Sequence, residues 1–219
     1  MSTPRRRDIF TQYPANTYEE LIVRYSGEDD GRLGASFAQA ADRLAGTHTG
    51  RPVDDALLLP YLYLYRHAME LDVKHAIRFA AKLRIVKGEK DPALPDPALG
   101  ERLKKTLRHK LPALVTELEK HLAALGLSTM PAKVRSVVNL VAAADPAGES
   151  FRYASGGPAG QDNINFVAMS TDIAETYRLL STAQDMLSAH EDILDDYMEA
   201  YRDAQAEMLA DMRQEYEQY

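Results

Sequence analysis

The sequence contains no cysteine and no tryptophan among its 219 residues. The lack of cysteine excludes disulfides, zinc–thiolate centres and cysteine nucleophiles, and it agrees with the cytoplasmic location that we expect. No apolar run reaches the length of a membrane span, so we expect no membrane partner. The N-terminal stretch reads MSTPRRRDIF and has no apolar core, so we do not expect it to be a secretory signal.

Several motifs of catalytic chemistry are also absent. The chain has no glycine-rich phosphate loop, no Gly-x-Ser-x-Gly and no His-Glu-x-x-His. His67 and Glu70 are three residues apart and would share a helix face, but di-iron bundles use Glu-x-x-His twice. No second copy of that pair exists. We therefore expect neither a metal nor a cofactor.

Charge is distributed unevenly along the chain. The net charge is −7, yet residues 186–219 hold ten acids and only two arginines, a balance of −8. The remaining 185 residues therefore sum to +1. An acidic tail on a near-neutral body gives nucleic acid no general electrostatic attraction, so a phosphate site would have to be local.

The fold is predicted to be all-α and organised around residues 54–86. Apolar residues recur there with the spacing of a helix that buries one face; examples are Leu62, Tyr65, Met69 and Val73. Pro60 stands near the expected start, where a missing N–H costs little, or it kinks the helix.

Further helices are expected on both sides of this central one. Their predicted ranges are 17–25, 36–44, 99–109, 111–125 and 131–145, with residues 27–34 as a loop. From residue 170 onward there is no glycine or proline, which predicts one long helix of about 45 residues. We predict a flexible N-terminal arm at 1–16, a helical domain at 17–200 and an acidic helical extension at 201–219.

Residues 146–169 interrupt the helical pattern. Glycine is frequent there, and aromatic residues flank Arg152. We predict a structured loop with two short extended pieces, around Phe-Arg-Tyr (151–153) and around 164–168. A long loop inside a helical chain is a common place for function.

The central helix carries a polar row of Arg66, Glu70 and Lys74, spaced by four residues, with His67 beside it. Two interpretations stay open. The row could be an ion ladder on a solvated face, which adds only a few tenths of a kcal/mol per pair, or it could be a polar site at the edge of a packed seam.

Four stretches in this order resemble the motifs of HEPN-like proteins, a helical superfamily of RNA- or nucleotide-associated domains. They are FAQAADRLAG, DDALLLPYLYLYRHAMELDVKHAI, RHKLPALVTEL and ESFRYASGGPAG. The resemblance covers roughly residues 35–200 and is carried most specifically by the Arg-His-x-x-Glu-Leu helix and the Phe-Arg-Tyr loop. Ala154 stands where the pattern usually has proline, Asp72 stands where an apolar residue is usual, and the acidic extension has no obvious counterpart.

The resemblance implies an antiparallel helical bundle, commonly a homodimer, and RNA as a partner. It also implies a metal-independent endoribonuclease, in which an arginine and a histidine with four to six residues between them act across a two-fold cleft. Arg102 and His109 fit this spacing in the most basic run of the chain, and Arg43 and His48 fit it in a glycine-flanked loop. The alternative for Arg102 and His109 is a solvated basic helix end.

A composite site is a second arrangement to test. Arg66, His67 and Glu70 could meet His109 and the loop that carries Arg152 and Tyr153, and take part in catalysis there. The residues expected to bind substrate are Lys74, Lys105, Arg108, Arg152 and Tyr153. In the structural alternative, Arg152 pairs with Glu70 and pins the loop to the bundle.

Two functions therefore remain open. One is an HEPN-like endoribonuclease, for which a bacterial defence or toxin–antitoxin setting would fit the family. The other is a non-catalytic HEPN-like binding or assembly module that holds a protein or nucleic-acid partner, for example through the acidic C-terminal helix.

Overall fold

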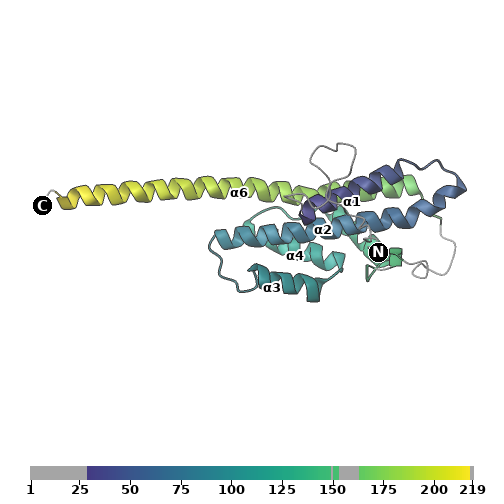
Figure 1. Cartoon of the computed structure of the whole chain (residues 1–219), viewed down its shortest axis with the longest axis horizontal. Coiled ribbons are helices and arrows are strands. Elements are labelled where there is room, and N and C mark those ends of the chain that lie inside the picture. The colour runs from purple at the N-terminus through teal and green to yellow at the C-terminus, as the bar shows by residue number, and fades with distance from the viewer. Residues whose placement is uncertain (1–28, 149, 153–162, 218–219) are drawn as a thin grey trace, which may run out of the picture.

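The chain is all-α in the computed structural model, which describes residues 29–148, 150–152 and 163–217. Among these residues the structure contains helices and no strand. The predicted arm at 1–16 and the predicted helix at 17–25 lie outside the described part of the chain. Figure 1 shows helix α2 at the centre of a bundle, with α6 running past it and far beyond it.

The central helix confirms the prediction made from apolar spacing. A short 3-10 segment, η1 (Pro52–Leu57), leads into α2 (Leu58–Val86), and Pro60 lies in the first turn of α2. The side chains of Tyr65, Met69, Val73 and Ile77 are at most 2% exposed. Because α2 contacts α1, α4 and α6, it supplies the inner wall of most of the core.

Helix α1 (Asp30–Ala45) begins six residues earlier than predicted, so the expected loop at 27–34 is wrong for the residues that the structure describes. Asp29 caps it by accepting a hydrogen bond from the Arg32 amide at 2.8 Å. Gly34, which suggested a loop, instead permits close packing: a Cβ there would lie 3.1 Å from the carbonyl oxygen of Ala68 on α2.

The helices after α2 follow the predicted order with one difference. The expected helix at 99–109 is divided into α3 (Asp96–Glu101) and a π-helical segment η2 (Arg102–Leu107). Helix α4 (Leu111–Leu125) has Pro112 in its first turn, as predicted, and α5 covers Ala132–Ala144.

The predicted extended pieces within 146–169 are wrong where the structure describes them. Ser150–Arg152 forms a 3-10 turn, η3, and Phe166 already begins the last helix. Tyr153 and most of the glycine-rich stretch lie outside the described residues.

Helix α6 (Phe166–Glu217) has 52 residues and therefore a length of about 78 Å. Its first half packs on the bundle through Ile173, Leu180 and Leu187, which are at most 3% exposed. The second half projects away from every other labelled helix (Figure 1). No helix among the described residues has the length and apolar character needed to cross a membrane.

Candidate functional site

Five polar side chains meet where α2 faces the ends of η2 and α5. We call Arg66, Glu70, Lys74, His109 and Asp145 the Arg66 cluster. Arg66, Glu70 and Asp145 are 4%, 3% and 1% exposed, so the polar row of α2 is not a ladder on a solvated face. Burial at this level requires that each charge find a partner.

The guanidinium of Arg66 binds three different groups. Its Nη1 lies 3.3 Å from Glu70 Oε2, its Nε lies 3.1 Å from Asp145 Oδ2, and its Nη2 donates to the backbone carbonyl of His109 at 2.6 Å. Arg66 thus ties α2, the end of α5 and the turn before α4 together.

Glu70 organises the other side of the cluster. Its Oε1 accepts from Lys74 Nζ at 2.7 Å and faces His109 Nδ1 at 2.8 Å. Burial alone would raise the pKa of Glu70, but the hydrogen bonds from Lys74 and His109 outweigh it, and the pKa lies below its usual value. Glu70 is therefore ionised at neutral pH.

The ionised carboxylate fixes the proton position on His109. A carboxylate only accepts hydrogen bonds, so the Nδ1 that faces Glu70 must carry a proton. In the neutral ring the lone pair is then on Nε2. The His109 side chain is 54% exposed, so the ring combines a buried anchor with access to solvent.

The backbone just before His109 is strained. Arg108 has φ of 49°, and it is the non-glycine residue with positive φ in the described part of the chain. An L-residue rarely adopts this conformation, which persists only where neighbouring contacts hold it. The bond from Arg66 to the His109 carbonyl is such a contact.

Asp145 and Gly148 belong to this site, although sequence reasoning assigned neither of them to it. Asp145 also accepts from the Ser150 amide at 2.8 Å. At Gly148, where φ is +78°, a Cβ would lie 2.8 Å from both terminal nitrogens of Arg66. A carboxylate at a helix C-terminus is opposed by the helix dipole, and this was the signal in the sequence that Asp145 needed a cation.

The two residues of the predicted Arg-x6-His motif have different partners. Arg102 Nη2 donates to Glu117 Oε2 at 2.9 Å, and its side chain is 41% exposed. Glu117 also lies 3.8 Å from His121 Nε2. His109 is paired with Glu70 instead. A shared cleft across a two-fold axis remains a prediction.

His67 lies among aromatic rings toward α1. Its ring packs edge-on against Phe37 with centroids 4.6 Å apart and stacks on Tyr63 at 6.0 Å. Burial lowers the pKa of His67, although the nearby Glu70 opposes this. This setting is that of a packed, uncharged histidine.

The predicted substrate-binding residues are placed in different ways. Lys74 is engaged by Glu70, whereas Lys105 is exposed and pairs with Glu101 on the surface. Arg108 and Arg152 are exposed. Tyr153 lies outside the described residues. In the weaker candidate pair, His48 packs against the Phe166 ring at 4.9 Å.

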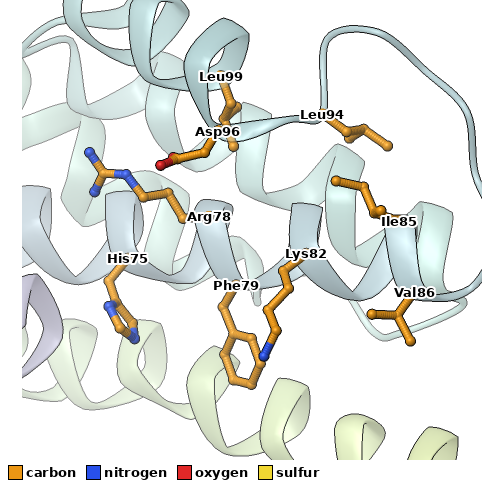
Figure 2. A pocket seen from close by; sticks show the side chains of 9 residues that line it. All are labelled: His75, Arg78, Phe79, Lys82, Ile85, Val86, Leu94, Asp96 and Leu99. Atoms are coloured by element: carbon orange, nitrogen blue, oxygen red, sulfur yellow. The ribbon is translucent and has the colours of Figure 1, made fainter.

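A groove elsewhere on the surface is separate from the Arg66 cluster. It encloses about 660 Å³ and is lined by α2 and by the segment that leads into and through α3 (Figure 2). Its lining residues are His75, Arg78, Phe79, Lys82, Ile85, Val86, Leu94, Asp96 and Leu99. None of these belongs to the cluster, whose His109 side chain is 54% exposed.

Among residues 29–148, 150–152 and 163–217, no group of three or more histidine and acidic residues is arranged to hold a metal ion. No protein-family model, no curated protein and no solved structure gave a significant match to the chain. The structure itself shows an all-α bundle in which a buried cluster of charged side chains contacts one exposed histidine, His109.

Proposed function

We propose that this protein is HEPN-like and acts on RNA as a metal-independent endoribonuclease, with His109 as the proton-transferring group. The observation that supports this best is the contact of 2.8 Å between His109 Nδ1 and the buried Glu70 carboxylate. It leaves Nε2 of a half-exposed imidazole able to accept a proton.

The chemistry requires no cofactor because RNA carries its own nucleophile. His109 Nε2 takes the proton of a ribose 2′-OH, and the 2′-oxygen then attacks the adjacent phosphorus. A P–O2′ bond forms while the P–O5′ bond breaks, which leaves a 2′,3′-cyclic phosphate. The departing 5′-oxygen takes a proton from a second general acid, which His109 of a second subunit would supply in a homodimer.

The phosphate would be bound by the basic surface beside His109. Lys104, Lys105, Arg108 and Lys110 are exposed around it. The surface pair between Lys105 and Glu101 is solvated, so exchange of Glu101 for a phosphate oxygen costs little.

Arg66 has a different role in this proposal from the one that its position in the motif implied. Its guanidinium is buried and bound to Glu70, Asp145 and the His109 carbonyl. It is therefore a positioning residue that fixes the turn carrying His109. Arg102 is the better candidate to stabilise charge on phosphate, since it is 41% exposed, although it would have to leave Glu117.

One observation favours the second candidate function, a non-catalytic HEPN-like binding or assembly module. The buried charges of the Arg66 cluster, on Arg66, Glu70 and Asp145, form ion pairs within the cluster, as expected for an element that only joins helices. In that case His109 would be the exposed edge of a structural network.

Cleavage of a mixed RNA pool in EDTA separates the two functions. We expect the wild type to leave 2′,3′-cyclic phosphate ends, and His109→Ala to lose activity by about 10²–10⁴-fold because the general base is gone. His67→Ala should retain activity, since that ring is packed against Phe37.

His75→Ala is the matched control: it removes an α2 histidine whose nearest acid, Asp29, is 3.9 Å away. If folded wild type leaves the RNA intact, or if His109→Ala cleaves as fast as wild type, the ribonuclease proposal is wrong. The first of these results favours the binding module.

A further inference from the structure

The projecting part of α6 continues the seam by which this helix packs on the bundle. Apolar residues recur at every seventh position of the helix: Ile173, Leu180, Leu187, Leu194, Tyr201 and Met208. The first three are at most 3% exposed, and Leu194 still packs against the core. From Asp195 onward every described side chain is exposed, and Tyr201 and Met208 are 50% and 57% exposed. The free half of α6, visible in Figure 1, therefore carries a packing seam that no other described helix covers.

A repeat of seven residues is typical of a helix that packs lengthwise on another helix. The residues three places further along in each repeat share the same face: Thr176, Ala183, His190, Tyr197 and Ala204. Thr176 and Ala183 are buried against the bundle, whereas Tyr197 is 64% exposed. The exposed half of the seam, which we call the tail stripe, consists of Leu194, Tyr197, Tyr201, Ala204 and Met208.

Most acids of the projecting half lie away from the tail stripe. Four of them lie at least about 120° round the helix from the centre of the stripe: Asp195, Asp196, Glu199 and Asp203. The positions that flank the stripe hold Ile193, Met198, Ala200, Gln205, Glu207 and Met212, of which only Glu207 is charged. Two such helices can therefore face each other with most of their negative charge on the outside, where separation and salt weaken the repulsion.

We propose that the tail stripe binds the tail stripe of a second copy of this chain, with the two helices antiparallel. The occupant needs an uncharged, largely apolar helix face about three heptads long, and the second copy has such a face. The bundle decides the direction of pairing. Because the bundle and the stripe occupy the same face of α6, a parallel copy would place its own α6 where α2 already lies. An antiparallel copy reaches the stripe from the free end of α6 (Figure 1).

This pairing keeps the two bundles at opposite ends of the joined helices. It is therefore not the contact that would bring two His109 rings together, and it does not depend on whether His109 cleaves RNA. Failure of either proposal would leave the other standing.

The first test is the molar mass of the full chain, measured by sedimentation equilibrium between about 1 and 100 μM. We expect the wild type to approach twice the 24.4 kDa of one chain. Tyr197→Ser/Tyr201→Ser should raise the dimer Kd by at least about tenfold, because both rings are central to the stripe. Glu199→Gln/Asp203→Asn changes the opposite face of the same helix and is the matched control, which should not weaken the dimer.

The second test measures the direction of pairing. The chain has no cysteine, so one introduced cysteine carries a spin label at one known position. Gln205→Cys places the two labels near the middle of an antiparallel pair. Asp192→Cys places them toward opposite ends, at least about 20 Å apart along the helix axis. Double electron–electron resonance should therefore give a clearly longer distance for residue 192 than for residue 205.

Three results would overturn the proposal. A folded wild type that is monomeric throughout this concentration range would leave the stripe to a different protein. A dimer that is equally stable in Tyr197→Ser/Tyr201→Ser would have its interface elsewhere. Similar short distances at residues 192 and 205 would make the pairing parallel.

Discussion

Two buried carboxyl groups on α2, only two residues apart, have opposite electrostatic character. Glu70 is 3% exposed and Asp72 is 2% exposed. The pKa of Glu70 is lowered despite burial, because Lys74 and His109 donate to it. Burial raises the pKa of Asp72 to about 7, and its neighbour Asp185 adds to the rise.

The difference lies in what each face of α2 meets. Glu70 belongs to the Arg66 cluster, where Arg66, Lys74 and His109 surround it. Asp72 faces α6, where Gln184 donates to its Oδ1 and its Oδ2 lacks a hydrogen bond. Depth of burial is the same, so the partners decide which carboxylate stays ionised.

The largest loss of stability is expected when a cation is removed from around Glu70, so that its surroundings resemble those of Asp72. Arg66→Met leaves Glu70 and Asp145 buried without their shared cation. We expect the free energy of unfolding to fall by about 3–5 kcal/mol, measured by urea denaturation. Arg102→Met is the matched control: with a side chain 41% exposed, that arginine should contribute no more than about 1 kcal/mol. Equal losses in the two variants would contradict the account.

The Asp72 side is tested by removing its charge. The pKa of Asp72 is about 7 in the folded chain against an ordinary value of 3.8, so the folded chain binds more protons than the unfolded chain between these two pH values. The contribution of Asp72 to the free energy of unfolding is therefore fully present at low pH. It decreases as the pH rises through that window and is constant above it.

Asp72→Asn should remove this pH-dependent loss of stability, because the amide does not ionise. Its advantage over wild type should grow from about pH 4 to pH 7 and reach about 2–4 kcal/mol, measured by denaturation at several pH values. Asp55→Asn changes an exposed acid and should show no such trend. An Asp72→Asn variant that is less stable than wild type at pH 8 would mean that Asp72 has a cationic partner in the folded state.

A smaller loss of stability is expected from substitutions of two glycines, and comparing them distinguishes steric crowding at the Arg66 cluster from backbone strain. Gly148 and Gly50 both have φ of +78°, but only at Gly148 would a Cβ meet Arg66, whereas nothing lies within 4 Å at Gly50. We expect Gly148→Ala to cost about 2–3 kcal/mol and Gly50→Ala about 1 kcal/mol, measured by thermal unfolding. Similar costs would show that Arg66 moves aside without penalty.

Periodicity predicted the parts of the fold that depend on local pattern. The apolar spacing of residues 54–86 gave α2, and the absence of glycine and proline after residue 170 indicated the long α6. The start of α1 was missed because Gly31 and Gly34 resemble a loop, while their role depends on how closely α2 and α6 approach.

The candidate site was predictable only in part. The spacing of Arg66, Glu70 and Lys74 placed them in one row, but burial of that row depends on segments more than thirty residues away in sequence. The sequence offers His109 both a motif partner, Arg102, and a place in the composite arrangement beside Arg66 and Glu70, and the structure brings His109 together with Arg66 and Glu70. Asp145 was recognised only as the end of a helix, because no local pattern shows which cation a buried acid will meet.

Whether Glu70 holds the proton of His109 on Nδ1 can be observed by ¹⁵N NMR of the ring nitrogens at a pH where the ring is neutral. We expect a proton on Nδ1, held by the Glu70 carboxylate, and an unprotonated Nε2. In Glu70→Gln this preference should weaken or be lost. A proton on Nε2 in the neutral wild-type ring would contradict the proposed proton position, because the lone pair would then lie on Nδ1, which faces Glu70, and Nε2 could not take the proton of a ribose hydroxyl.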